Sequence, residues 1–163
     1  MLEKAVFLDR DGVINYERGC YTTNVDDFII NNGIGEAIKL LKNNNFLVIV
    51  ISNQAGLAKK LFTENDLLEM HIKLCTYLFD YQTNIDDFFV CPHHPDFTNC
   101  LCRKPKSLLF EKALAVYNID PKLSFMIGDS ERDIIAAEKC GIKGILIESN
   151  RNIIEICEQI IAS

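Results

Sequence analysis

Phe7-Leu8-Asp9-Arg10-Asp11-Gly12-Val13 places two carboxylates one residue apart, directly after an apolar run at residues 5–8. An apolar run bounded by a glycine is typical of a buried parallel strand, and ligands of open α/β sheets lie beyond the carboxyl ends of such strands. Carboxylates held this close repel each other, which favours a bound cation such as Mg²⁺, or a shared proton. The pattern predicts a phosphoryl-transfer site in which Asp9 attacks phosphorus and Asp11 protonates the leaving oxygen. The alternative interpretation is a solvated polar turn after a strand.

The rest of the chain alternates short apolar runs with helical periodicity. Further strands are expected at residues 46–51, 88–90, 123–127 and 145–147. Alternating strands and helices predict an α/β fold with a doubly wound, Rossmann-like parallel sheet. We expect a single domain over residues 1–163, because no linker, repeat or low-complexity tract interrupts the pattern. The expected helical faces are Ile34, Ile38 and Leu41; Leu67, Met70, His71, Leu74 and Leu78, after a capping box at Thr63 and Asp66; Leu108, Leu109, Lys112, Ala113 and Val116, ending near Asn118; Ile134 to Cys140, ending at Gly141; and Ile153, Ile156, Cys157 and Ile160.

Composition and charge restrict the possible partners. Of the 163 residues, 48% are hydrophobic and the net charge is −6, which suits one well-buried acidic domain. The acidic balance argues against a general nucleic-acid or anionic-membrane surface and favours a small anionic metabolite. No apolar segment reaches membrane-spanning length and the N-terminus has no signal-like pattern. We therefore expect a cytoplasmic monomer that binds neither nucleic acid nor membrane.

Two further segments bring polar side chains to the same edge of the predicted sheet. Ser52-Asn53-Gln54-Ala55-Gly56 offers a hydroxyl and backbone amides that can cradle a phosphoryl group, although an ordinary strand-to-helix loop is the more frequent explanation of such a segment alone. Gly128-Asp129-Ser130-Glu131-Arg132-Asp133 adds acids, and Asp129 is expected to complete a Mg²⁺ shell. Asp133 lies one helical turn later, where it either supports the site or favours the helix N-terminus.

The cysteine positions predict a second metal site. Cys91-Pro92-His93-His94-Pro95 and Cys100-Leu101-Cys102 offer four soft ligands, which suits tetrahedral Zn²⁺. Because protein atoms fill all four positions, this metal would be structural; incidental loop thiols are the alternative, and the spacing admits either histidine. Arg103-Lys104-Pro105 follows directly, so the loop would hold two cations at the mouth of the site. Of the other thiols, Cys20 lies in a loop near the first motif, whereas the helical stripes place Cys75, Cys140 and Cys157 in the core.

Taken together, these motifs resemble the haloacid dehalogenase (HAD) superfamily, with Asp9-x-Asp11, Ser52, Lys104, and Asp129 with Asp133 as its four motifs. The Cys-Pro-His-His-Pro and Cys-x-Cys-Arg-Lys-Pro runs resemble, more narrowly, the capless, zinc-containing heptose bisphosphate 7-phosphatases and the related histidinol-phosphatase domains. The resemblance implies catalytic roles for Asp9, Asp11, Ser52 and Lys104; Mg²⁺ held by Asp9, the Asp11 carbonyl and Asp129; Zn²⁺ held by Cys91, His93, Cys100 and Cys102; and substrate contacts from Asn53, Gln54, Arg103, Glu17, Arg18, Gly19, Cys20 and Ser130.

The implied activity is Mg²⁺-dependent hydrolysis of a small phosphorylated sugar in carbohydrate metabolism. The expected reaction removes the 7-phosphate of D-glycero-D-manno-heptose 1,7-bisphosphate through an aspartyl-phosphate. The chain departs from the family at Ser130, where a basic residue is frequent, and at Lys106-Ser107-Leu108, which lacks the familiar glycine. Histidinol phosphate is the alternative substrate, and a nucleic-acid 3′-phosphate fits the acidic charge poorly. A phosphoacceptor signalling domain also combines acids, a hydroxyl and a lysine, but there the acid pair and the acceptor lie on different strands.

Overall fold

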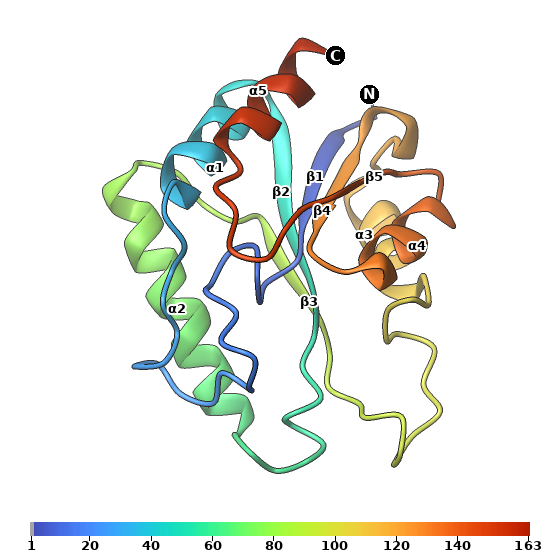
Figure 1. The fold of residues 1–163 in the computed structure, drawn as a ribbon. Coiled ribbons are helices and arrows are strands. Elements are labelled where there is room, and N and C mark those ends of the chain that lie inside the picture. Colours follow the sequence, from blue (N-terminus) through green and yellow to red (C-terminus); the bar gives the residue numbers. More distant parts are fainter. Residues whose placement is uncertain (1) are drawn as a thin grey trace.

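Five parallel strands form the central sheet of the computed structural model, which describes residues 2–163 (Figure 1). Their order across the sheet is β3-β2-β1-β4-β5, so the chain winds outward from β1 in one direction and then in the other. This order confirms the predicted α/β fold with a doubly wound parallel sheet. The strands are β1 (Lys4–Leu8), β2 (Phe46–Asn53), β3 (Asp87–Cys91), β4 (Phe125–Gly128) and β5 (Lys143–Leu146), and the helices are α1 (Ile34–Asn43), α2 (Glu64–Asp80), α3 (Leu108–Tyr117), α4 (Glu131–Glu138) and α5 (Ile154–Ala162).

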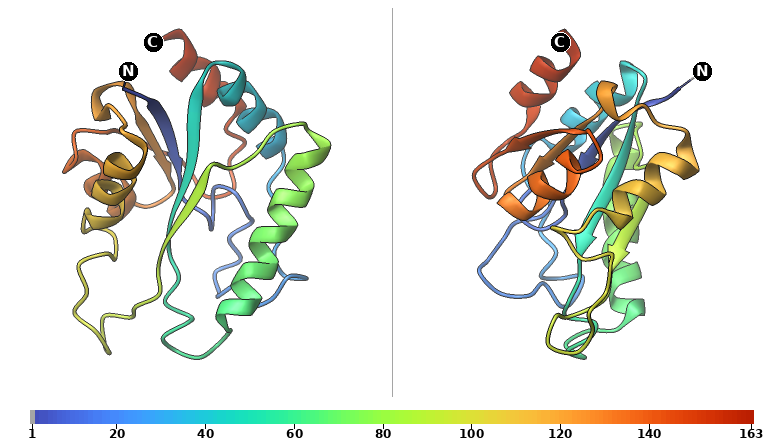
Figure 2. Two further views of the ribbon diagram at one scale, coloured as in Figure 1. Left: turned by 180° about the vertical axis from the view of Figure 1, so that it is seen from behind. Right: turned by 90° about the vertical axis from the view of Figure 1, so that its right-hand side faces the viewer.

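Helices cover both faces of the sheet (Figures 1 and 2). Helices α1, α2 and α5 pack on one face, and α3 and α4 pack on the other. In the central strand β1, Val6 and Leu8 point into the first core while Ala5 and Phe7 point into the second. A strand that packs on both faces is apolar at every position, which explains the continuous run before Asp9. Within residues 2–163, no helix has both the length and the apolarity that crossing a bilayer requires.

Strand register brings the carboxyl ends of β1 and β4 to nearly the same level at one edge of the sheet, and β2 runs on past them to Asn53. Leu8 pairs with Val50 of β2 and with Ile127 of β4. The Asp9 N–H then donates to the Ile127 carbonyl at 3.1 Å. The segments that follow these three strands therefore emerge at the same edge of the sheet, while the two ends of the described chain lie at the opposite end of the molecule (Figure 2).

Several helix ends follow the predicted capping signals. Helix α2 begins after Thr63, whose Oγ1 accepts from the Asp66 N–H at 3.2 Å while the Thr63 N–H donates to the Asp66 carboxylate at 2.7 Å. Helix α3 ends at Asn118, which adopts a left-handed φ of 51°. Gly141, with a φ of 79°, follows α4. Local sequence therefore determines where these three helices begin or end.

Two predicted strands, 123–127 and 145–147, include residues that lie outside the observed β4 and β5. Leu123 belongs to the 3-10 turn Pro121–Leu123 and is 53% exposed, so it does not open β4. Ser124 separates the turn from the strand, because its Oγ donates to the Asp120 carbonyl and accepts from the Ala5 N–H. Strand β5 ends at Leu146, and the N–H of Ile147 donates instead to the Gly128 carbonyl.

Two helical faces also differ from the prediction. Helix α4 begins at Glu131 rather than Ile134. Val116 is 67% exposed, because Phe110 completes the buried face of α3 in its place. Of the three cysteines predicted in the core, Cys157 is fully buried and Cys140 is half-buried. Cys75 is exposed, since it lies one position beyond the buried Leu74 of α2.

His71 lies on the inner face of α2 as a neutral side chain. Its ring stacks on that of Phe88, with centroids 4.1 Å apart, and its buried Nε2 has no hydrogen-bond partner among residues 2–163. Burial lowers the pKa of His71 to about 4, and the nearby Arg10 guanidinium adds to this effect. At neutral pH the ring therefore behaves as an apolar side chain.

Lowering the pH from about 7 to about 4.5 should reduce the free energy of unfolding through His71. The unfolded chain binds a proton near pH 6.5 and the native ring only near pH 4, so between these values the unfolded state binds more protons and stability rises with pH. His71→Phe should remove about 2 kcal/mol of this pH dependence, measured by urea denaturation at both pH values. An equal pH dependence in the variant would contradict the neutral, buried state of His71.

Candidate active site

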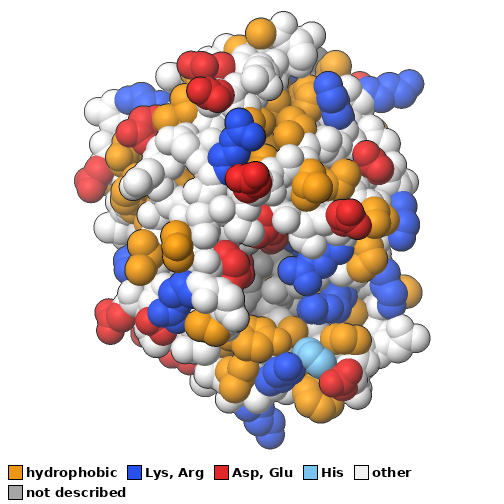
Figure 3. Space-filling view, in the orientation of Figure 1, with side chains coloured by type: hydrophobic (Ala, Val, Ile, Leu, Met, Phe, Trp, Pro, Cys, Tyr) orange, Lys and Arg blue, Asp and Glu red, His pale blue; other side chains and the backbone are white. Residues whose placement is uncertain are grey.

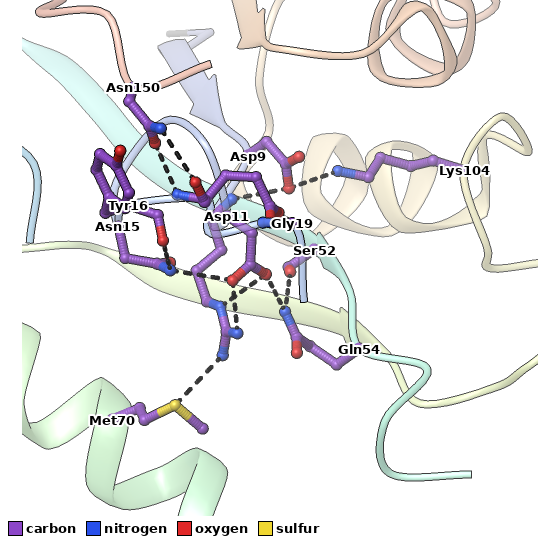
Figure 4. Close-up of polar contacts among 12 residues, drawn as sticks. Asp9, Asp11, Asn15, Tyr16, Gly19, Ser52, Gln54, Met70, Lys104 and Asn150 are labelled. Atoms are coloured by element: carbon purple, nitrogen blue, oxygen red, sulfur yellow. Dashed lines mark hydrogen bonds and ion pairs between the residues drawn. The ribbon is translucent and has the colours of Figure 1, made fainter. Parts of the chain in front are cut away.

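Acidic, hydroxyl and amide side chains converge at the carboxyl edge of the sheet (Figure 4). Asp9 follows β1, Ser52 lies near the end of β2, and Asp129 follows β4. Carboxylate oxygens of Asp9, Asp129 and Asp133 lie within 4.8 Å of one another. The edge therefore has the position and the donor types of a ligand site in an open α/β sheet.

Lys104 lies at the floor of this edge rather than at its mouth. Its side chain is 1% exposed, and Nζ lies 2.9 Å from Asp9 Oδ1 and 2.8 Å from Asp133 Oδ1. Nζ also donates to the Ile51 carbonyl at 2.6 Å, while the Asn53 side chain exchanges two hydrogen bonds with the Lys104 backbone. Burial alone would lower the pKa of Lys104, but the two carboxylates outweigh it and raise the pKa. Lys104 therefore carries a positive charge that is fixed in place and shielded from solvent.

Asp133 fulfils both roles that the sequence left open. It is fully buried and pairs with Lys104 through Oδ1. Its other oxygen accepts a hydrogen bond from the Ser130 N–H at 3.1 Å, at the start of α4. A Cβ on Gly128 would lie 2.5 Å from the Asp133 Cβ, so the glycine lets Asp133 approach the strand end. Helix capping and charge pairing thus use different oxygens of one carboxylate.

These carboxylates carry more negative charge than Lys104 neutralises. Burial raises the pKa of Asp9 to about 7 against the lowering effect of Lys104, and the Asp133 carboxylate adds to the rise. A divalent cation beside Asp9 and Asp129 would relieve the repulsion, and carboxylate oxygens suit Mg²⁺. Gly12, with a φ of 85°, makes room for Asp129, because a Cβ there would lie 2.0 Å from Asp129 Oδ2. The donor set fits Mg²⁺, and Asp133, which the sequence did not assign as a ligand, is near enough to contribute.

The Asp11 carboxylate binds Arg10. The Arg10 side chain is 1% exposed and donates to both Asp11 oxygens, at 2.9 and 3.1 Å. Asn15 and Gln54 donate to the same carboxylate at 3.0 and 2.8 Å, and Gln54 also donates to Ser52 Oγ at 2.7 Å. Although burial works to raise it, these donors, Arg10 foremost, hold the pKa of Asp11 below its ordinary value. Arg10 and Asn15 were not assigned from the sequence, although both lie beside the first motif.

A pocket of about 360 Å³, within the size range of small-molecule sites, opens beside Asp11. Figure 3 shows a hollow in this face, with acidic side chains on one side and a group of Lys and Arg side chains on the other. Arg18 and Ser130 do not line the pocket, and Arg18 instead pairs with Asp27 at 2.8 Å. Of the predicted substrate contacts, Asn53, Gln54, Arg103, Glu17, Gly19 and Cys20 line it, and the structure adds Arg132, Tyr21 and Thr22.

The loop after β5 ties the pocket to the first motif (Figure 4). The Asn150 side chain accepts from the Glu17 N–H at 2.7 Å and donates to the Glu17 carbonyl at 3.2 Å, while the Asn150 N–H donates to the Gly12 carbonyl at 2.7 Å. Next to it, Ser149 donates to Asp129 Oδ2 at 2.6 Å. Neither residue is predicted from the sequence, because the only local signal is a single asparagine, here with a left-handed φ of 68°.

Four soft ligands meet in the loop after β3. Cys91 Sγ lies 3.7 Å from Cys100 Sγ and 3.1 Å from Cys102 Sγ. His93 Nδ1 lies 3.6 Å from the first of these sulfurs, Cys91 Sγ, and 3.2 Å from Cys102 Sγ. A tetrahedral Zn²⁺ with bonds of about 2.3 Å to sulfur separates its sulfur ligands by about 3.8 Å, so the cluster matches such a site after slight expansion. Of the two candidate histidines, His93 is the one in the cluster.

The doubly wound fold, with a carboxylate after the central strand, a buried lysine, a hydroxyl and a second acid at its carboxyl edge, has the arrangement of the HAD-like hydrolase class. Residues 101–158 match the profile of the family described as HAD-hydrolase-like. The chain is 39% identical over 149 residues to the D-glycero-beta-D-manno-heptose-1,7-bisphosphate 7-phosphatase of Haemophilus ducreyi, covering 88% of this chain and 81% of that relative. The chain therefore belongs to the D-glycero-D-manno-heptose-1,7-bisphosphate 7-phosphatase family, and it is a phosphatase.

Other relatives extend the similarity over nearly the whole chain. The protein of the same name from Photorhabdus laumondii is 37% identical over 163 residues, which covers 95% of this chain and 86% of that one. The crystal structure of D,D-heptose 1,7-bisphosphate phosphatase from B. bronchiseptica, complexed with magnesium and phosphate, superposes with a TM-score of 0.92 at 28% identity and covers 99% of both chains. The fold of this chain is thus that of a heptose bisphosphate phosphatase.

Replacing Lys104 by methionine should lower the free energy of unfolding by about 3–5 kcal/mol, because it leaves two buried carboxylates without their cation. Urea denaturation measures the loss, and Lys112→Met, at an exposed position of α3, should change stability by less than about 0.5 kcal/mol. Adding Asp133→Asn to Lys104→Met should restore part of the loss, since one unpaired charge disappears. Equal effects of the two lysine variants would show that the buried charges do not depend on Lys104.

Proposed function

We propose that the protein removes the 7-phosphate of D-glycero-D-manno-heptose 1,7-bisphosphate and leaves the 1-phosphate in place. The observation that carries the reaction type is Asp9, held by buried Lys104 at 2.9 Å and close to Asp129. The substrate follows from the relatives of 31 to 39% identity that are named for this activity. A small phosphorylated sugar also suits a pocket of about 360 Å³. Action in the cytoplasm, as a monomer, stays a prediction.

The proposed reaction has two steps. Asp9 attacks the phosphorus atom in line and forms an aspartyl-phosphate, while Asp11 gives a proton to the departing sugar oxygen. Water then hydrolyses the aspartyl-phosphate, with Asp11 as the base. Lys104 and Ser52 offset the charge of the transferring group. Because Ser52 Oγ accepts from Gln54, its own O–H stays available to a phosphoryl oxygen.

Asp11 has to be protonated before it can act as the acid of the first step, and substrate binding has to bring this about. Before substrate enters, Arg10 holds the pKa of Asp11 low, although burial works in the other direction. A phosphoryl dianion beside Asp11 raises the pKa of that carboxyl by charge repulsion and so favours the protonated acid. Arg10 therefore keeps Asp11 a base in the empty site and lets it act as an acid only next to a phosphate.

Two metals fit the proposed enzyme. Asp9, the Asp11 carbonyl and Asp129 would hold Mg²⁺, which when bound neutralises and orients the phosphoryl group. Cys91, His93, Cys100 and Cys102 would hold a structural Zn²⁺. The same loop, between β3 and α3, also carries Arg103, whose Nη1 donates to the His93 carbonyl at 3.3 Å. Substrate contacts are proposed for Arg103 and for Asn53, Gln54, Glu17, Gly19 and Cys20, which line the pocket with it.

Asp9→Asn should lower phosphate release from the heptose bisphosphate by about three orders of magnitude or more, because the amide cannot act as the nucleophile. Phosphate release is measured with Mg²⁺ for the heptose bisphosphate and for histidinol phosphate, and Asp26→Asn, at an exposed position, is the control. Circular dichroism should show the same fold for both variants. Near-normal turnover by Asp9→Asn would refute Asp9 as the nucleophile. A preference of the unaltered protein for histidinol phosphate would refute the proposed substrate. A single stoichiometric phosphorylation of the unaltered protein, without turnover, would indicate a phosphoacceptor domain instead of an enzyme.

Purified protein should contain about one tightly held Zn²⁺ per chain, and Cys100→Ser should lose it. The physical reason is that a hydroxyl replaces a thiolate in a four-ligand site. Metal analysis by mass spectrometry measures the content, with Cys75→Ser, an exposed thiol on α2, as the control that retains the metal. Full zinc content in Cys100→Ser would overturn the proposed ligand set.

A further inference from the structure

One part of the pocket wall, residues 17–22, belongs to no helix or strand and is here called the pocket loop. The residues of this loop that line the pocket are Glu17, Gly19, Cys20, Tyr21 and Thr22. Within the loop the Gly19 N–H donates to the Glu17 carboxylate at 2.6 Å, which fixes a local turn but not its place relative to the sheet. Thr22 is 4% exposed and anchors the far end of the loop. The near end, at Glu17, needs an anchor from elsewhere in the chain.

The side-chain amide of Asn150 provides this anchor (Figure 4). Its Oδ1 accepts from the Glu17 N–H at 2.7 Å, and its Nδ2 donates to the Glu17 carbonyl at 3.2 Å. Among residues 2–163, no other backbone N–H or carbonyl of the pocket loop forms a hydrogen bond with a residue outside the loop. A primary amide offers both a donor and an acceptor, so one side chain satisfies both polar groups of the Glu17 backbone.

The backbone of Asn150 is itself attached to the carboxyl edge of the sheet. Its N–H donates to the Gly12 carbonyl at 2.7 Å, and three residues earlier the Ile147 N–H donates to the Gly128 carbonyl at 2.9 Å. The φ of 68° at Asn150 is left-handed, a conformation that glycine adopts more readily than asparagine. Glycine would therefore serve the backbone at this position, and the two hydrogen bonds to Glu17 are what the asparagine side chain adds.

We propose that Asn150 is a positioning residue, whose amide places the pocket loop against the sugar of the bound substrate. The inference rests on the proposed function and deepens it. Both hydrogen bonds of the Asn150 side chain go to Glu17, and neither reaches Asp9 or Lys104, where the proposed phosphoryl transfer takes place. A loop that is already in place costs less free energy to order when substrate binds. Asn150 therefore acts on KM and leaves the chemical step unchanged.

Asn150→Gly isolates the contribution of the side chain, because glycine keeps the left-handed backbone and the N–H that binds Gly12. With the heptose bisphosphate and Mg²⁺, KM should rise about 10-fold, since two hydrogen bonds to the loop are lost, while kcat should stay within about twofold. The matched control is Asn45→Gly, at an exposed asparagine with a left-handed φ of 62° between α1 and β2. Because Asn45 precedes β2, at the opposite edge of the sheet, this variant should change neither value.

Hydrogen exchange followed by NMR tests the position of the loop without substrate. The Gly19 amide is hydrogen-bonded inside the pocket loop and does not touch Asn150, so its exchange reports on the loop itself. In Asn150→Gly this amide should exchange faster, while the amides of β1 and β2 should exchange as in the unaltered protein. A role of Asn150 in overall stability would instead speed exchange throughout the sheet and lower kcat through loss of folded enzyme, with KM unchanged.

Any departure from this pair of results would overturn the inference. An unchanged KM, or a loss confined to kcat, would mean that substrate binding does not depend on the Asn150 amide. A higher KM with unchanged exchange at Gly19 would mean that the amide acts on the substrate and not on the loop. An equal rise of KM in Asn45→Gly would show a general effect of glycine. In these cases the unaltered protein still hydrolyses the bisphosphate and the proposed function stands, whereas absence of phosphate release by the unaltered protein would refute the proposed function, and the inference with it.

Discussion

The buried ammonium group of Lys104, held between the carboxylates of Asp9 and Asp133, is the contact on which the rest of the site depends. It joins the end of β1, the loop between β3 and α3 that carries the Cys/His cluster, and the first turn of α4. Such a buried charge triad adds little net stability, because desolvation offsets most of the Coulomb attraction. Its main effect is on position, since the buried lysine fixes where the Asp9 carboxylate lies and, in the proposed reaction, where the phosphoryl group would be placed.

The segment that carries Lys104 has little apolar packing of its own. Between β3 and α3 the chain forms neither helix nor strand, and Phe97 and Leu101 are 64% and 69% exposed. A loop of this kind cannot hold a buried cation in place by hydrophobic contacts alone. The cluster of three cysteines and His93 offers an alternative. Bonds from these four residues to one metal ion would stabilise the loop in the way that the many contacts of a small apolar core otherwise do. The Cys/His cluster and the buried position of Lys104 are therefore linked through one loop.

How much could be predicted from the sequence depends on whether the signal is local. The continuous apolar run of β1, the Thr63 cap and the Cys/His spacing are local patterns, and the structure contains each of them. The depth of Lys104 and the clamp that Asn150 places on Glu17, 133 positions away, arise only when distant segments pack together. Exposed Val116 and Leu123 make the same point, because apolar side chains are common on surfaces and their burial depends on what covers them.

The position of β1 affects how the protein becomes active during its synthesis. The ribosome releases the N-terminal end first, yet β1 is the central strand and needs β2 and β4 on either side. The loop after it is held in part by Asn150, which binds Gly12 and Glu17. A growing chain therefore carries its acidic motif for most of translation without a formed pocket. The pocket can take its final form only after the segment around Asn150 has left the ribosome.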